Sequence, residues 1–158
     1  MNKIFITIAT IGLLATGAYA ADGGKKAEKT TTVSYSVQNQ FNADFSDATN
    51  VVWTITPNTQ KASFTDNGVK MTAFYSLQGE YMGVTQDVTY SEISAKAKKQ
   101  ITDKYKDYDV NEVIKLVTND SNVNFDQTVY FVDLKNPQSE VLVRVTPSSD
   151  VYFFKQVK

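Results

Sequence analysis

The stretch QFNADFSDATNVVW, from Gln40 to Trp53, is followed later in the chain by a related stretch, QITDKYKDYDVNEVI, from Gln100 to Ile114. Each joins apolar residues at helical spacing to a run that is typical of a strand. Three short apolar runs follow each stretch: KASF, VKMTAFY and GEYMGV after the first, and TVYF, EVLVRVT and DVYFFKQV after the second. A repeat of about 60 to 70 residues is too long for a solenoid and suits a small domain built by duplication.

The two copies predict an α+β domain with two layers. In each copy an amphipathic helix precedes a four-stranded antiparallel meander, and the tandem units form one sheet that is covered by helices on one face. We match the helices and strands by the following pairs: Phe41 with Ile101, Phe45 with Tyr105, Phe64 with Phe131, and Tyr81 with Tyr152. We also expect Phe41, Trp53, Phe64 and Ile101 to be mostly buried.

Local signals predict where each element begins and ends. The first helix runs from Ser36 to Ala48 with Ser34 or Ser36 as its cap, and the second runs from Tyr90 to Tyr108 with Thr89 or Ser91 as its cap. Turn residues separate the expected strands. These are Val51 to Thr56, Lys61 to Thr65, Val69 to Ser76, Glu80 to Thr85, Val110 to Thr118, Gln127 to Lys135, Glu140 to Thr146 and Val151 to Val157.

The N-terminal segment predicts export. Lys3, the apolar run from Ile4 and the closing Ala18-Tyr19-Ala20 have the zones of a secretory signal at residues 1–20. Residues 21–33 are rich in Gly, Lys and Thr and are expected to form a flexible linker. Residues 34–158 then form one domain of two repeats, about 34–88 and 89–158. We expect a periplasmic or secreted protein with no stable membrane insertion after signal cleavage.

Composition argues against most kinds of enzyme active site and metal site. The chain has no histidine and no cysteine, so Ser-His-Asp, Cys-His and zinc systems each lack an essential member. We expect no enzyme, no cofactor and no metal. Asp120 to Asp126 places oxygen ligands at alternate positions as a calcium loop would, but it lacks the required glycine, because Phe125 stands there.

Charge argues against nucleic acid as a partner. The net charge is −1, and the one basic cluster, from Lys96 to Lys106, is interrupted by Asp103 and carries no outward aromatic residue for base stacking. A solvated helix face explains this cluster.

Several strands are apolar on both sides, whereas a sheet covered on one face should alternate. Part of this surplus is expected in the core, and the rest predicts an open, tyrosine-rich face that binds an exported protein or peptide. The candidate binding residues are Tyr81, Tyr130, Arg144, Tyr152 and Phe153. Two alternatives remain at this point: an envelope protein that binds a small ligand or lipid, and a weak enzyme based on paired carboxylates.

The residues from Phe41 onward resemble the PepSY-like periplasmic proteins of Bacteroidota-type bacteria, which share the fold of the β-lactamase inhibitor protein. The resemblance lies in Ala48-Thr-Asn-Val-Val-Trp53, Lys61-Ala-Ser-Phe-Thr65, Ala73-Phe-Tyr75, Gly79-Glu80 and Tyr105-x-x-Tyr108. The chain has Glu92-Ile93-Ser94 where the family tends to show Leu-Pro. The resemblance implies this fold and an inhibitor-like binding role, and it supplies no catalytic residues.

Overall fold

The computed structural model describes residues 32–119 and 128–158. Its helices are α1 (Tyr35–Asp44) and α2 (Ala95–Lys104), with a short 3-10 helix (Tyr90–Glu92) before α2. Its strands are β1 (Thr49–Ile55), β2 (Gln60–Asp66), β3 (Val69–Tyr75), β4 (Tyr81–Asp87), β5 (Asp109–Thr118), β6 (Thr128–Lys135), β7 (Glu140–Val145) and β8 (Val151–Gln156).

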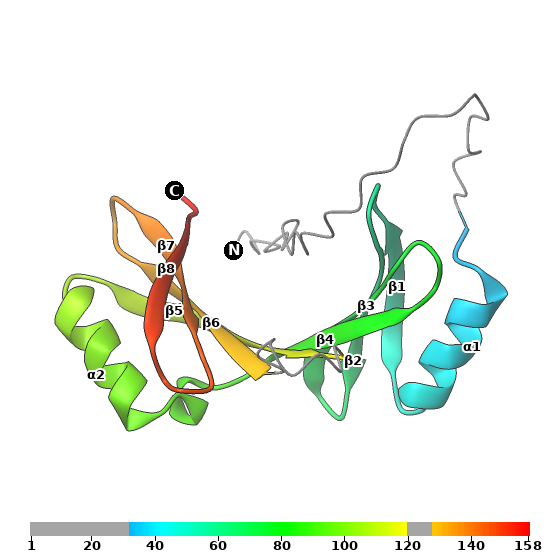
Figure 1. Cartoon of the computed structure of the whole chain (residues 1–158), viewed down its shortest axis with the longest axis horizontal. Helices are drawn as coiled ribbons and strands as arrows, with labels where there is room; N and C mark the ends of the chain where they lie inside the picture. Colours follow the sequence, from blue (N-terminus) through cyan, green and yellow to red (C-terminus); the bar gives the residue numbers. More distant parts are fainter. Residues whose placement is uncertain (1–31, 120–127) are drawn as a thin grey trace.

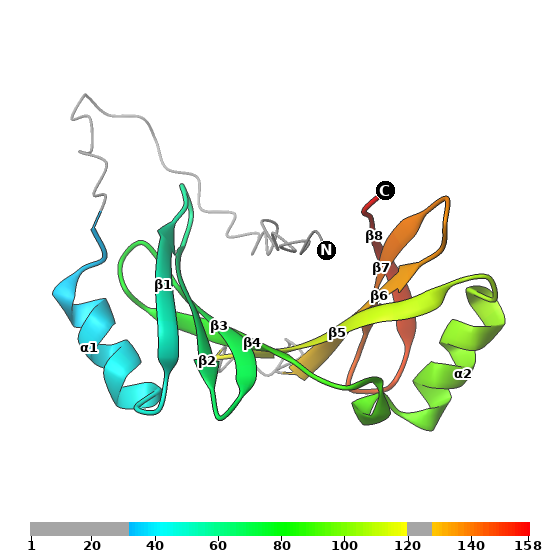
Figure 2. The ribbon, with the colours of Figure 1, turned by 180° about the vertical axis from the view of Figure 1, so that it is seen from behind.

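The strands form one antiparallel sheet in which each pairs with the next along the chain, in the order β1 to β8. Every predicted strand is present, with bounds that differ by no more than two residues. The sheet curves strongly along its length (Figure 1). Both helices lie on its outer, convex side, α1 beside β1 and α2 at the other end, which the reverse view also shows (Figure 2).

The helices begin at serines in extended conformation. The Ser34 hydroxyl accepts from the Val37 amide (3.4 Å), and the Ser94 hydroxyl accepts from the Ala97 amide (3.2 Å). The prediction that the second helix starts at Tyr90 was wrong. Ile93 is extended and separates the 3-10 helix from α2, so the cap is Ser94 and neither Thr89 nor Ser91.

Aromatic residues fill the space between α1 and the sheet. Phe41 of α1 packs edge-on against Phe64, with ring centroids 5.0 Å apart, and both are buried together with Tyr75. Val33 also belongs to this cluster and is buried, although it falls in the segment expected to be a linker. Trp53 is only partly buried, because β1 is an edge strand with no neighbour on one side.

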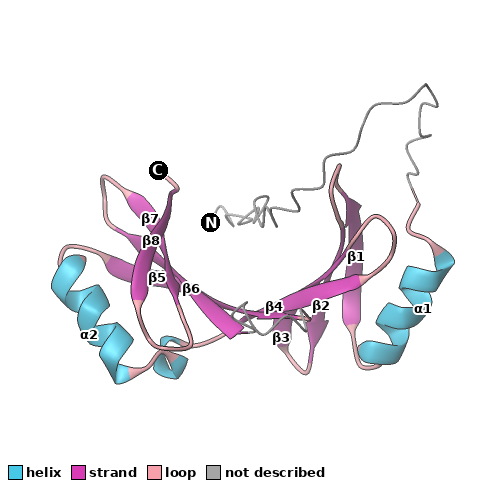
Figure 3. Ribbon diagram, in the orientation of Figure 1, coloured by secondary structure: helices cyan, strands magenta, loops and turns pink. Residues whose placement is uncertain are grey.

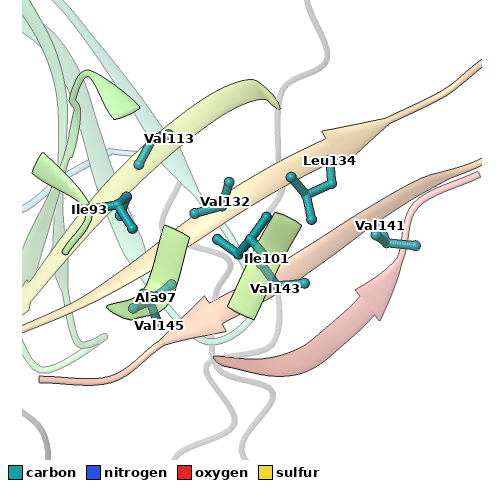
Figure 4. Close-up of a cluster of buried hydrophobic side chains, with 9 residues drawn as sticks. All are labelled: Ile93, Ala97, Ile101, Val113, Val132, Leu134, Val141, Val143 and Val145. Atoms are coloured by element: carbon teal, nitrogen blue, oxygen red, sulfur yellow. The ribbon is translucent and has the colours of Figure 1, made fainter. Parts of the chain in front are cut away.

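The space under α2 is filled by aliphatic residues instead (Figure 4). Ala97 and Ile101 of α2 face valines and a leucine of β5, β6 and β7: Val113, Val132, Leu134, Val141, Val143 and Val145. The side-chain amide of Gln100 holds α2 to the β7–β8 turn, since it donates to the Ser149 carbonyl (2.8 Å) and accepts from the Val151 amide (3.3 Å).

Strand register corrects two of the residue matches made from sequence. Ala62 lies opposite Trp53, and Val132 lies opposite Val113. Phe64 lies two residues after Ala62, and Leu134 lies two residues after Val132. Both side chains are on the helix-covered side of the sheet, so Leu134 is the residue that matches Phe64 by position. Phe131 lies on the other face.

The second corrected match is that of Tyr81. Tyr81 lies opposite Tyr75 and Val151 lies opposite Val145, so Tyr81 corresponds to Val151. Tyr152 is one residue further along. A shift of one residue moves a side chain to the opposite face of a sheet, so Tyr81 and Tyr152 have different surroundings.

Candidate binding face

The candidate site is the side of the sheet that faces away from both helices, which we call the open face. Figure 3 shows that this is the concave side, with neither α1 nor α2 covering it. Register assigns residues to it. Val143 and Val145 of β7 point into the α2 cluster, so Arg144, between them, points to the open face. Tyr152 lies directly opposite Arg144 on β8 and shares that face.

The half of the open face near α1 is polar. Val52, Ser63, Thr72 and Thr85 form a row across β1, β2, β3 and β4. The Ser63 and Thr72 hydroxyls are hydrogen-bonded to each other at 3.2 Å, and the Thr85 hydroxyl donates to the Thr72 carbonyl at 3.4 Å. This row gives the face a strip of hydroxyl groups.

The half of the open face near α2 contains an apolar cluster. Leu116, Val129, Phe131 and Leu142 form a buried cluster that packs against neither helix. These side chains come from neighbouring positions on β5, β6 and β7. Phe154 of β8 extends the cluster, since its ring lies 4.9 Å from that of Phe131.

Two aromatic side chains stay accessible beside this apolar cluster. Tyr152 is 55% exposed and Phe154 is 38% exposed. Arg144 is half-buried between them and the sheet centre, and it makes an interaction of its own. Tyrosine and arginine side chains of this kind supply much of the contact energy at protein interfaces.

Carboxylates form a diagonal line across the middle of the open face. Asp87 of β4, Glu112 of β5 and Asp133 of β6 occupy neighbouring positions on adjacent strands. Burial raises the pKa of each of the three above its ordinary value. The charges of Asp87 and Asp133 add to the raised pKa of Glu112, whereas nearby Lys70 lowers it.

The predicted site residues divide between the two faces. Arg144 and Tyr152 share the open face. Tyr81 packs against the aromatic cluster under α1, and Tyr130 packs against the aliphatic cluster under α2, so these two do not belong to it. Burial, followed by the charge of Asp44, raises the pKa of Tyr81. Phe153 lies opposite Val143 and is 55% exposed, but it faces the helix side.

Sequence reasoning missed Phe154 and the buried cluster beneath it. The register of β7 against β8 shifts between Leu142 and Val143, which is a β-bulge. Tyr152 and Phe154 are two residues apart and therefore share a face, as in any regular strand, and the bulge leaves Phe154 without a partner on β7, between Phe153 and Lys155. Strict alternation along Tyr152-Phe153-Phe154 would have grouped Phe154, and not Phe153, with Tyr152.

The described part of the chain contains neither a metal-holding cluster nor a membrane-spanning helix. No group of three or more acidic residues within residues 32–119 and 128–158 is arranged to hold a metal ion, histidine and cysteine being absent from the chain. No helix among these same residues is long and apolar enough to cross a membrane. The calcium-like segment Asp120 to Asp126 and residues 1–31 lie outside the described residues.

The basic cluster of α2 is partly neutralised on the helix surface. Lys96 contacts the Asp150 carboxylate at 2.8 Å and lowers its pKa together with Ser148. Lys99 contacts Asp103, also at 2.8 Å. These contacts agree with the interpretation of the cluster as a solvated helix face.

Known structures share the fold. A DUF2874 family protein from Bacteroides uniformis superposes with a TM-score of 0.70 at 17% identity, over 80% of this chain and 91% of that one. A BLIP-like protein from Bacteroides fragilis gives 0.64 at 13% identity, over 78% and 86%. A candidate periplasmic protein from Bacteroides eggerthii gives 0.71 at 17%, over 80% and 90%. No protein-family model and no curated protein matches the sequence.

These neighbours define the class of fold: a BLIP-like antiparallel sheet with two helices, found in Bacteroides proteins. At 13% to 17% identity the likeness concerns the fold alone.

Proposed function

We propose that this chain is an exported, non-enzymatic binding protein whose open face receives a protruding segment of another exported protein. The observation that carries the proposal is the position of Tyr152, which is more than half exposed and lies opposite Arg144 on the concave side of the sheet. A concave surface suits a convex partner segment, and an aromatic residue beside an arginine is a common pairing at interface centres.

The cell envelope is the proposed location. The signal-like residues 1–20 support it, and so does the candidate periplasmic neighbour of the same fold. An inhibitor-like role in the envelope is the form of binding that the BLIP-like fold suggests.

We also infer that the two halves of the domain are tandem copies, and that the chain is related to the PepSY-like proteins. Both helices are ten residues long with a serine at the N-cap, and in both the residue after the helix donates its amide to the carbonyl four residues earlier. The matching pairs Trp53 with Ala62 and Val113 with Val132 support the duplication.

The proposal is tested with two neighbouring residues that point to opposite faces. A partner is first captured by crosslinking in the native envelope fraction, identified and purified. Its affinity is then measured for the wild type, for Tyr152→Ala and for Phe153→Ala by titration calorimetry. Because Tyr152 and Phe153 are equally exposed, at 55%, the two variants remove similar accessible area.

We expect Tyr152→Ala to weaken binding by about tenfold or more, since a central aromatic anchor is worth roughly 2 kcal/mol, while Phe153→Ala leaves the affinity unchanged. Adding Arg144→Ala to Tyr152→Ala should weaken binding further. Equal effects of the two single variants, or none from Tyr152→Ala, would refute the assignment of the open face.

A further inference from the structure

Two acidic side chains that no binding role explains are buried on the open face at the α2 end. Asp133 of β6 and Glu140 of β7 are each only 2% exposed. Asp133 lies opposite Leu142 and Glu140 lies opposite Lys135, so the two acids are diagonal neighbours on adjacent strands. Burial raises the pKa of Asp133, and the Glu140 carboxyl raises it further.

The donors around this pair are too few for two ionised carboxylates. The Asn111 side-chain amide donates to Oδ2 of Asp133 at 2.6 Å, and the Lys135 ammonium contacts Oε2 of Glu140 at 3.0 Å. Oδ1 of Asp133 is buried and has no donor among the described residues. A buried polar atom without a partner is costly, and a proton held between the two carboxyl groups would satisfy this oxygen.

The charges on the neighbouring strands favour the protonated state. Glu112 of β5 lies directly opposite Asp133, and Asp87 of β4 lies beyond Glu112. Lys135 and, further away, Lys70 oppose them. Burial raises the pKa of Asp133 most, Asn111 lowers it, and the Glu140 charge raises it again.

Glu140 is also the residue to which the end of β8 attaches. Its carbonyl accepts from the Val157 amide (2.7 Å) and the Lys158 amide (3.2 Å), and its own amide donates to the Lys158 carbonyl (3.2 Å). The Gln156 side chain donates to the same Glu140 carbonyl at 3.2 Å. On β8 itself the nearest charged side chain on this face is Lys155, opposite Leu142.

We propose that Asp133 and Glu140 share one proton, and that losing this proton loosens the attachment of the C-terminal end of β8 to β7. The pair is then a pH-sensitive contact within the sheet: two buried negative charges repel each other, and the strand that carries one of them also holds the chain terminus. This inference is independent of the proposed binding function.

The direction of the pH effect follows from linkage. A carboxyl group with a raised folded pKa binds its proton more tightly in the native state than in the unfolded state. Its stabilising effect is therefore complete at pH below the ordinary aspartate value of 3.8. It is lost progressively as the pH rises from there through the raised pKa of Asp133.

The direct test is a carboxyl titration of the wild-type chain by ¹³C NMR, with Asp133 assigned from the signal missing in Asp133→Asn. We expect the Asp133 carboxyl to titrate above 3.8, in step with the loss of amide protection at Val157 and Lys158 after correction for intrinsic exchange. An Asp133 carboxyl that titrates at or below its ordinary value would overturn the proposal, whether or not any variant folds.

Asp133→Asn is the matched variant, because an asparagine can accept from Asn111 and donate to Glu140 without a proton that titrates. Urea midpoints measured from about pH 4 to about pH 8 should fall more steeply in the wild type than in Asp133→Asn. Glu112→Gln is the comparison variant: it removes a neighbouring charge that favours the protonated pair but leaves Asp133 and Glu140 in place, so the fall should become smaller without disappearing. The Glu112→Gln variant should keep the part of the fall in urea midpoint that depends on Asp133, and it should keep the pH-dependent amide exchange at Val157. Identical pH profiles for wild type and Asp133→Asn would contradict the shared proton.

Discussion

At the scale of single residues, the hydroxyl of Tyr75 is buried without a hydrogen-bond partner among the described residues. Tyr75 is fully buried among the aromatic residues under α1. Burial is the first cause of its strongly raised pKa, followed by the charge of Asp44. Tyr75 contributes ring packing, with centroids 5.6 Å from Tyr81 and 6.0 Å from Trp53, and its oxygen opposes folding.

We therefore predict that Tyr75→Phe is more stable than the wild type. Removing a buried hydroxyl that has no partner recovers its desolvation cost, about 1 kcal/mol, while the ring contacts remain. The measurement is the urea midpoint at neutral pH, with Tyr35→Phe as the control because Tyr35 is 78% exposed. A lower midpoint for Tyr75→Phe would mean that the hydroxyl makes a stabilising contact.

Two glycines make a second test at this scale. Gly83 of β4 has φ +148°, and a Cβ there would lie 2.4 Å from the Val117 carbonyl oxygen of β5. Gly68, in the β2–β3 turn, has φ +81° but meets nothing within 4 Å. A side chain at position 83 would clash with β5, because β4 and β5 approach closely where the two halves of the sheet join. At position 68 there is room for a side chain, and glycine is favoured there only by the positive φ.

Gly83→Ala should destabilise the fold by about 3 kcal/mol, because strain and the clash with β5 add. Gly68→Ala should cost about 1 kcal/mol from strain alone. Thermal or urea unfolding of the two variants measures the difference. If the two costs are equal, the strands do not approach each other as closely at Gly83 as the structure shows.

At the scale of elements, much of the fold is readable from sequence, because hydrophobic periodicity and turn residues are local signals. The eight strands and both helices were located in this way. What could not be read is register. The β7–β8 bulge beside Val143 leaves no mark in the hydrophobic pattern. Ile93 is extended and is buried in the cluster under α2, and the second helix therefore starts at Ala95 and not at Tyr90.

The same limit explains the outcome for the candidate site. Arg144 and Tyr152 are cross-strand neighbours on the open face, and their role in binding stays a prediction. Tyr81 and Tyr130 were chosen because tyrosine is common at interfaces, but their register places them under the helices. A tyrosine at a strand end suits both positions, so composition alone does not separate them.

The start of α2 gives a prediction at this scale. Ser94→Ala should lower stability by about 1 kcal/mol, because it removes the side chain that accepts from the Ala97 amide. Ser91→Ala should have little effect, although sequence made Ser91 a candidate cap. Unfolding curves of the two variants decide between them, and a larger loss for Ser91→Ala would contradict the observed helix start.

At the scale of the whole molecule, the two faces of the sheet carry different side chains. The convex side carries both helices and two clusters of buried side chains (Figure 1). The concave side combines a hydroxyl strip, an apolar cluster and a line of acids with raised pKa values. We infer that the convex side stabilises the fold and that the concave side is available for recognition.

The chain has no cysteine, so single cysteines can report which face a partner covers. Lys155→Cys places a thiol on the open face, opposite Leu142, and Lys99→Cys places one on the outer surface of α2, where the lysine side chain is 76% exposed. The decisive measurement is the rate of thiol alkylation in each variant with and without the purified partner. We expect the partner to slow alkylation at position 155 and to leave the rate at position 99 unchanged. Slowing at position 99 alone, or at neither position, would contradict binding at the concave face.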